Sequence, residues 1–207
     1  MNIFLILAIG YLLGSIPFGY LIARLAGGRD IRSEGSGNIG ATNVTRSLGL
    51  GAGLATLVLD AGKGACAVWL ATRLSGNLST SFAFAAIGAI LGHLFPFWLR
   101  FRGGRGVATA MGAFLVIGWM ATLADLLVWV VAMVIWRYAS LSSILWAALL
   151  PLLMYWLYVP GHHPPENVSI AAVIAALLIL WRHRPNLQRL IEGNEPKMHF
   201  RGSSGRG

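Results

Sequence analysis

The sequence predicts an all-α, polytopic membrane protein, a bundle of about seven transmembrane helices of which two are short. Hydrophobic residues make up 57% of the 207 residues and charged residues only 11%, and the mean hydropathy is +0.70. A soluble globular domain carries roughly 25% charged residues. We expect residues 1–207 to form a single integral-membrane domain, with a disordered Gly/Ser/Arg-rich tail over 199–207.

Apolar runs separated by polar segments predict the individual spans. The first run is predicted to be retained, because no basic residues precede it and no A-x-A-like cleavage site follows it. Residues 107–136 would form a helix of ~45 Å, too long for a ~30 Å hydrocarbon core. Two short spans that turn between Gly118 and Asp125 fit better. The predicted spans are 3–25, 50–73, 81–100, 106–122, 123–138, 141–159 and 168–182.

Basic residues predict the orientation of the bundle. The chain has 16 Lys and Arg against 7 Asp and Glu, and the arginines cluster at 24–46, 100–105, 137 and 182–206. With seven spans all these clusters fall on one side, and the other side keeps only Arg73. The positive-inside rule then places the N-terminus outside and the C-terminus in the cytoplasm. Because the cations lie at span ends, their predicted partners are membrane lipids and not nucleic acid.

A polar, glycine-containing segment separates the first two apolar runs. It reads Ser-Gly-Asn-Ile-Gly-Ala-Thr-Asn-Val-Thr-Arg over residues 36–46. The glycines let backbone N–H groups turn toward one point, the neutral side chains add hydrogen-bonding groups, and Arg46 adds a permanent cation. Such a set suits an oxyanion, above all a phosphate. The same residues are equally compatible with a polar turn between helices.

A second glycine-rich segment joins the third and fourth predicted spans. It contains Gly-His-Leu-Phe-Pro from residue 92 and Phe-Arg-Gly-Gly-Arg-Gly-Val-Ala-Thr from residue 101. The first amides of the following helix lack intrahelical partners, and the glycines let an anion approach them. Arg102 is better interpreted as an interfacial anchor. Arg105, between two glycines, is better interpreted as a phosphate ligand.

Further polar residues are predicted to converge on the same cytoplasmic face. One group, at 137–143, includes Ser140, which is also compatible with a helix cap. The other begins at residue 182 as Arg-His-Arg-Pro-Asn-Leu-Gln-Arg, whose cations are also compatible with a topology anchor. Within the second span, Asp60 and Lys63 lie one turn apart and can pair, either structurally or as part of a site. Convergence of polar groups from separate helices is typical of a binding site.

At these residues the chain resembles the bacterial acyl-phosphate-dependent glycerol-3-phosphate acyltransferases of the inner membrane. The resemblance runs from Leu-Leu-Gly-Ser-Ile-Pro in the first span to His-Arg-Pro-Asn-Leu-Gln-Arg-Leu near the end. It implies transfer of a fatty acyl group from acyl phosphate to the 1-hydroxyl of glycerol 3-phosphate, the first step of phospholipid synthesis, on the cytoplasmic side. The products would be 1-acylglycerol 3-phosphate and inorganic phosphate. The family usually has lysine where this chain has Arg105, which exchanges a point cation for a planar fork.

The resemblance also assigns roles to individual positions. It implies that Ser36, Arg46 and Arg105 hold phosphate groups, and that Ser143, His183 and Asn186 seat glycerol 3-phosphate. Of these, we expect Ser36, Arg46, Arg105, His183 and Asn186 to be catalytic. The remaining expected substrate-binding positions, some of them supporting, are Gly37, Asn38, Gly40, Thr42, Asn43, Lys63, His93, Gly103 and Gly104.

The predicted chemistry needs little covalent help from the protein. An acyl phosphate is already activated, so the site must hold two anionic substrates together and stabilise charge on the carbonyl oxygen. His93 is not followed by Asp at the fifth position, where the residue is Trp98, and no Ser-His-Asp set is visible. We therefore expect direct attack without an acyl-enzyme, with His183 or a substrate phosphate oxygen as the base.

Two other functions are alternatives to acyl transfer. A transporter of a phosphorylated solute would use the same glycines and arginines, but the basic groups lie at span ends and no inverted repeat is visible. A lipid-binding scaffold is the second alternative. We predict no cofactor and no metal, since Cys66 is the single cysteine and the pair His162 and His163 has no clear partner beyond Glu166. The oligomeric state is left open, and a monomer is compatible with the sequence.

Overall fold

The computed structural model describes residues 2–75, 79–159 and 162–198, and every regular element in these ranges is helical. This confirms the predicted all-α membrane fold. The predicted tail over 199–207 lies outside the described residues. The helices are α1 (Ile3–Gly14), α2 (Phe18–Gly27), α3 (Ala41–Leu48), α4 (Leu50–Ser75), α5 (Ser79–Leu94), α6 (Val107–Ile117), α7 (Trp119–Trp136), α8 (Ala139–Leu157), α9 (Glu166–Arg182) and α10 (Arg184–Ile191), with short 3-10 turns η1 (Ile31–Ser33) and η2 (Phe97–Leu99).

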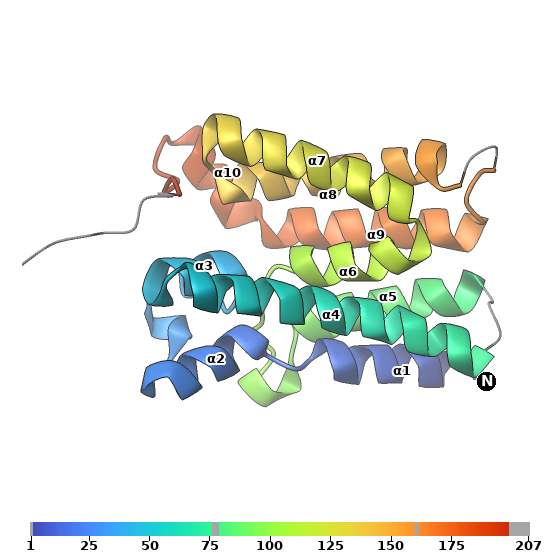
Figure 1. Ribbon diagram of the computed structural model, residues 1–207, viewed down its shortest axis with the longest axis horizontal. Coiled ribbons are helices and arrows are strands. Elements are labelled where there is room, and N and C mark those ends of the chain that lie inside the picture. Colours follow the sequence, from blue (N-terminus) through green and yellow to red (C-terminus); the bar gives the residue numbers. More distant parts are fainter. Residues whose placement is uncertain (1, 76–78, 160–161, 199–207) are drawn as a thin grey trace, which may run out of the picture.

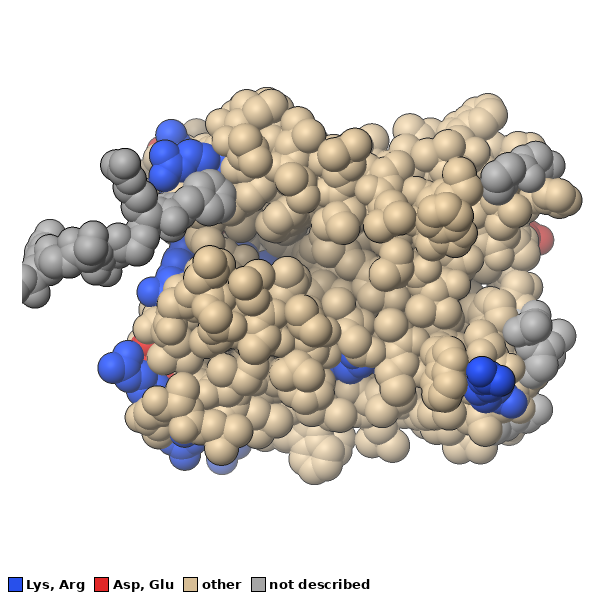
Figure 2. Space-filling model, viewed as in Figure 1, with Lys and Arg blue, Asp and Glu red and all other residues tan. Residues whose placement is uncertain are grey.

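The long helices run back and forth along one axis (Figure 1). The N-terminus lies at one end of the bundle, and α2, α3 and α10 lie at the opposite end, which we call the basic end. Figure 2 shows Lys and Arg side chains gathered there. Arg73, in the last turn of α4, belongs to the other end. This distribution is the one that seven alternating segments predict, while the side of the membrane that each end faces stays a prediction.

All seven predicted spans correspond to helical segments, but they differ in length. Five are long and apolar enough to cross a membrane, and a sixth results if α9 and α10, bent by 56°, count as one span. The remaining apolar helix, α6, has 11 residues and is only ~16 Å long. The break that was predicted between Gly118 and Asp125 falls at Gly118, where the backbone leaves the helical conformation (φ −150°, ψ 80°).

The first predicted span, 3–25, is confirmed as one candidate span over Ile3–Gly27, but its helix is interrupted between Gly14 and Phe18, which was not predicted. Pro17 lacks a backbone N–H and disfavours helical geometry in the residue before it. The carbonyl of Ile16 is satisfied instead by the Lys63 Nζ of α4, at 2.7 Å. A non-helical backbone at membrane depth needs such a protein partner. Two eight-residue helices at the basic end, α3 and α10, were not predicted.

Small residues let neighbouring helices approach closely. A Cβ at Gly14 of α1 would overlap the backbone of Ala89 in α5, and a Cβ at Gly112 of α6 would overlap that of Ala61 in α4. Such contacts are the usual means of packing helices in lipid. They fix α5 and α6 against α1 and α4, and the loop between α5 and α6 therefore lies beside α4 at the basic end.

Candidate active site

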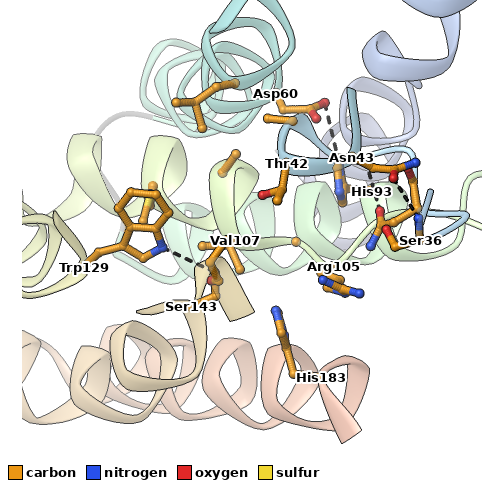
Figure 3. A pocket seen from close by; sticks show the side chains of 18 of the residues that line it. Ser36, Thr42, Asn43, Asp60, His93, Arg105, Val107, Trp129, Ser143 and His183 are labelled. Carbon is orange, nitrogen blue, oxygen red and sulfur yellow. Dashed lines mark hydrogen bonds and ion pairs between the residues drawn. The ribbon is translucent and has the colours of Figure 1, made fainter. Parts of the chain in front are cut away.

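A cavity of about 130 Å³ lies among the helices near the basic end. It is enclosed by the segment around α3, by α4, by the start of α6, and by parts of α7, α8 and the α9–α10 junction (Figure 3). Its lining residues are Ser36, Asn38, Gly40, Ala41, Thr42, Asn43, Arg46, Leu57, Asp60, His93, Arg105, Gly106, Val107, Ala108, Met111, Leu126, Trp129, Ala139, Ser143 and His183.

Two helices begin at this cavity without a side-chain cap. Gly40 precedes α3 and Gly106 precedes α6, and neither N-terminus receives a hydrogen bond from a capping side chain. Gly106 has a φ of 88°, a left-handed conformation that favours glycine. Uncapped N-termini present free N–H groups and the positive end of the helix dipole. The cavity is therefore suited to an anion independently of its arginines.

The first loop, residues 34–40, is held by the buried side chain of Asn43. The Asn43 Oδ1 accepts a hydrogen bond from the Ser36 amide at 2.8 Å. The Nδ2 donates to the carbonyls of Ile31, Glu34 and Asn38 at 3.2, 3.0 and 2.9 Å. Asn43 thus lies in the cavity wall but uses its polar atoms to shape the loop.

The second loop, residues 100–106, is held by residues outside it. The Gly103 amide donates to the Leu94 carbonyl at 3.1 Å, and the Gly104 amide donates to the His93 carbonyl at 3.0 Å. A Cβ at Gly104 would overlap the His93 imidazole, which packs directly against it. The loop therefore sits on the C-terminal end of α5, and this contact requires glycine at 104.

A buried ionic cluster supports one wall of the cavity. The Lys63 Nζ lies 2.7 Å from the Asp60 Oδ1, which confirms the predicted pairing. The His93 Nδ1 lies 3.6 Å from the same carboxylate oxygen. Asp60 and His93 line the cavity, whereas Lys63 is turned toward the break between α1 and α2. The cluster thus joins α4 to α5 and to the interrupted first span.

Two arginines bring positive charge to the cavity. Burial lowers the pKa of Arg105 to about 10, and the charges of Arg189, Arg46 and Arg182 act in the same direction while Glu195 opposes them. Arg46 donates from its Nη2 to the carbonyl of Pro196 at 3.0 Å, so the segment after α10 reaches α3. A guanidinium is the group of choice for bidentate binding of phosphate.

His183 is buried at the junction of α9 and α10, and its ring extends into the cavity between Ser143 and Arg105 (Figure 3). Its Nδ1 lies 2.8 Å from the carbonyl of Ile179. Because a carbonyl only accepts, Nδ1 must carry the proton, and Nε2 of the neutral ring is left as an acceptor. Burial first, and then the Arg105 charge, lower the pKa of His183 to about 4. The ring is therefore neutral near pH 7.

One wall of the cavity is apolar. It is formed by Leu57 of α4, Met111 of α6, and Leu126 and Trp129 of α7. The Trp129 Nε1 donates to the Ser143 Oγ at 3.3 Å, and this hydroxyl donates to the Ala139 carbonyl at 2.7 Å. The cavity thus joins a cationic end to an apolar wall.

The structure brings most of the predicted site residues together. Ten line the cavity: Ser36, Asn38, Gly40, Thr42, Asn43, Arg46, His93, Arg105, Ser143 and His183. Five do not: Gly37, Lys63, Gly103, Gly104 and Asn186. Gly37 and Gly103 line a separate cavity of about 950 Å³, together with residues of α2, η1 and η2. Gly104 is covered by His93.

Asn186 does not line the cavity, although the family resemblance implies a catalytic role for it. Its Nδ2 donates to the Glu195 Oε1 at 2.7 Å, and the other carboxylate oxygen accepts from the Arg189 Nε at 2.8 Å. Burial opposes ionisation of Glu195, but hydrogen bonding with Ser140, Asn186 and Arg189 lowers its pKa overall. Sequence reasoning missed Glu195; the available signal was a pair of acidic residues, Glu192 and Glu195, in a C-terminal segment whose other charged residues are basic.

The comparisons with known proteins agree with one another. A family model described as glycerol-3-phosphate acyltransferase matches residues 4–193. A glycerol-3-phosphate acyltransferase of Rhodopseudomonas palustris (strain BisB5) is 46% identical over 192 residues, which cover 93% of this chain and 94% of that protein. One from Nitrobacter winogradskyi is 47% identical over 191 residues, which cover 92% and 93%.

Two solved structures are similar as well. They are crystal structures of PlsY, an integral membrane glycerol 3-phosphate acyltransferase, in a glycerol 3-phosphate form and a lysophosphatidic acid form. Each is 38% identical to this chain and covers 96% of both chains, with TM-scores of 0.86 and 0.84.

Proposed function

Because the chain belongs to the glycerol-3-phosphate acyltransferase family, we propose that it transfers a fatty acyl group from acyl phosphate to the 1-hydroxyl of glycerol 3-phosphate. The products are 1-acylglycerol 3-phosphate and inorganic phosphate. The reaction is then the first step of phospholipid synthesis, and neither a cofactor nor a metal takes part in it.

The observation that carries this proposal is the union of a cationic end and an apolar wall in one cavity. Arg46, Arg105 and the N-termini of α3 and α6 offset the repulsion between two phosphate groups. The acyl chain of the donor lies along Leu57, Met111 and Trp129. Figure 2 looks onto the hollow between α4 and α7, from which a membrane-dissolved amphiphile reaches this wall.

The proposed step is a direct acyl transfer. The hydroxyl oxygen of glycerol 3-phosphate attacks the carbonyl carbon of the donor, and the bond from that carbon to the phosphate oxygen breaks. The phosphate leaves with the electron pair, while the hydroxyl proton passes to His183 Nε2 or to a phosphate oxygen. The Nδ1 contact with Ile179 leaves Nε2 unprotonated and available. Arg105 and Arg46 stabilise the departing phosphate.

The test is an assay with purified protein, acyl phosphate and glycerol 3-phosphate. We expect inorganic phosphate and lysophosphatidate to appear in equal amounts, and neither to appear when one substrate is omitted. A transporter or a lipid-binding scaffold would yield no lysophosphatidate, and that result would refute the proposal.

The proposed donor has its own test. No nucleotide-binding signature is evident in the sequence, so acyl-CoA has no obvious site on this chain. We expect acyl-CoA to fail when it replaces acyl phosphate. Robust turnover with acyl-CoA and glycerol 3-phosphate, in the absence of acyl phosphate, would refute acyl phosphate as the required donor. The proposed acceptor would stand.

We further propose that the chain resides in the bacterial inner membrane with the basic end in the cytoplasm. The clustering of cations at that end supports this orientation through the positive-inside rule. A topology reporter fused after Glu192 should read as cytoplasmic, and one after Glu166 as external. A cytoplasmic signal at Glu166 would contradict the orientation.

A further inference from the structure

Arg182, the last residue of α9, binds the carbonyl groups of the second loop. Its Nη2 donates to the carbonyl of Gly103 at 2.9 Å and its Nε donates to the carbonyl of Gly104 at 3.2 Å. The guanidinium also lies 5.8 Å from the ring centroids of both Phe95 and Trp181. Its position is thus fixed by two hydrogen bonds and two aromatic faces.

These two carbonyls are closely tied to the direction of the Arg105 side chain. The Gly104 carbonyl belongs to the peptide group that bonds directly to the Arg105 nitrogen, so its orientation sets the backbone from which the side chain leaves. The amides of Gly103 and Gly104 are already bound to the end of α5. With Arg182 in place, the N–H and C=O groups of both glycines are all engaged.

We propose that Arg182 is a positioning residue, which holds the second loop so that the Arg105 guanidinium faces the substrate phosphate. This inference rests on the proposed function. The competing view is that Arg182 anchors the end of α9 at the membrane surface, as the sequence analysis allowed. An anchor needs only a charge in contact with water or lipid headgroups.

The geometry requires arginine and not merely a cation. A planar guanidinium presents several N–H donors in a fixed fork, and two neighbouring carbonyls match that fork. A lysine ammonium keeps the charge but lacks the fork and the flat face that lies against aromatic rings. Replacement by lysine should therefore preserve anchoring but not positioning.

Arg184 provides a matched control, because it lies two residues away at the same end of the bundle. It is exposed, its guanidinium lies 5.2 Å from the Trp181 ring centroid, and it makes no side-chain hydrogen bond among the described residues. If membrane anchoring were the role of this basic segment, alanine at 182 and alanine at 184 would have similar effects.

The experiment compares Arg182→Ala, Arg182→Lys and Arg184→Ala in the full chain, with thermal stability measured on each. Misplacing a catalytic group by ~1 Å costs on the order of 10²-fold. We expect kcat to fall about 10- to 100-fold in both Arg182 variants and by less than about 2-fold in Arg184→Ala. Free guanidinium ion should restore part of the rate of Arg182→Ala. Equal losses at 182 and 184, or full activity in Arg182→Lys, would overturn the proposal.

A double-mutant cycle tests whether the effect passes through Arg105. In the Arg105→Ala background, Arg182→Ala should cause little further loss, because there is no guanidinium left to position. Additive losses would contradict the proposal.

The same cycle run on the binding of inorganic phosphate, with no turnover required, keeps the two proposals distinguishable. If the parent binds phosphate with the predicted coupling but transfers no acyl group, the proposed function fails and the positioning role stands. If the parent binds no phosphate, or binds it without coupling between 182 and 105, the positioning role fails.

Discussion

Each of the two loops that border the cavity positions an arginine there, but different kinds of contact hold the two loops in place. The first loop, residues 34–40, leads into α3 and its Arg46, and it is tied together by one buried amide, that of Asn43. The second loop carries Arg105 itself, and its glycines are tied to α5 on one side and to α9 on the other. The partners of the first loop lie within 12 residues of one another, whereas Arg182 is 78 residues from Gly104.

This difference predicts different sensitivities. A locally closed loop keeps its shape as long as its own side chains are intact, even if neighbouring helices shift. A loop that is hydrogen-bonded to two separate helices moves when either helix shifts, and the residue that it carries moves with it. We therefore expect damage to the first loop to originate within it, and damage to the second loop to originate also in α5 and α9.

The largest expected effect on turnover comes from removing either of the two arginines that are proposed to bind phosphate. A charge-assisted contact to a desolvated phosphate is worth roughly 2–4 kcal/mol, so Arg46→Ala and Arg105→Ala should each lower turnover about 30- to 1000-fold. Arg73→Ala, at the opposite end of the bundle, should be nearly silent in the same phosphate-release assay. If stable, folded Arg46→Ala turned over like the parent, the first loop and α3 would not form a phosphate cradle.

The next largest effect should come from Asn43→Asp, which breaks the first loop from within. The substitution keeps the oxygen that accepts from Ser36 but places a second oxygen against three carbonyls. Each buried acceptor left without a donor costs about 1–3 kcal/mol, so we expect a marked fall in melting temperature and a loss of activity of roughly 100-fold. Asn167→Asp is the control, since among the described residues that amide donates to the hydroxyls of Ser79 and Thr80, at the opposite end of the bundle, and to no carbonyl. A parent-like melting curve for Asn43→Asp would refute the account of the first loop.

The contrast between the loops also explains what could be predicted from the sequence. Residues 36–46 hold both a ligand and the side chain that shapes the loop, so a contiguous motif indicates the site. The support of the second loop is distributed over α5 and α9, and nothing in the motif around Arg105 points to Arg182. Glu195 was missed for a similar reason, because its partners Asn186 and Arg189 become neighbours only when the chain turns back after α10.

The fold shows the same limit. Long apolar runs predicted the seven helical segments, since hydropathy depends on local composition. The interruption at Ser15–Pro17 was missed because the contact that stabilises it is not local. The free carbonyl of Ile16 accepts a hydrogen bond from Lys63 of α4, which lies 47 residues away in the sequence. The helix α3 was missed because its sequence, with Thr45 and Asn43 in a run of eight residues, is too short and polar to predict a helix without its tertiary contacts.

Gly104→Ala should break the second loop with a smaller effect. The added Cβ would overlap the His93 imidazole, so either the ring or the loop must move. We expect kcat to fall about 10- to 100-fold, because Arg105 is displaced while its charge is kept. Gly62→Ala in α4 is the matched control, since a Cβ there meets open space. In the double variant Gly104→Ala/His93→Ala, which lacks the ring, the rate should recover only in part, because His93 also lies against Asp60. Parent-like activity in Gly104→Ala alone would show that the close contact between Gly104 and His93 is dispensable.

The smallest effect at neutral pH is expected for Arg105→Lys, which keeps the charge on the second loop and exchanges a fork for a point cation. Phosphate binding requires the charged form, so activity should be lost as the pH rises through the pKa of this residue. Burial has lowered the pKa of Arg105 to about 10. Lysine starts from an ordinary pKa of ~10.4, about two units or more below that of arginine, and the same burial acts on it. The alkaline limb of kcat/KM should therefore move to lower pH in Arg105→Lys, while most activity remains near pH 7. Arg73→Lys should leave the limb in place, and an unmoved limb in Arg105→Lys would show that the group titrating there is not the residue at 105.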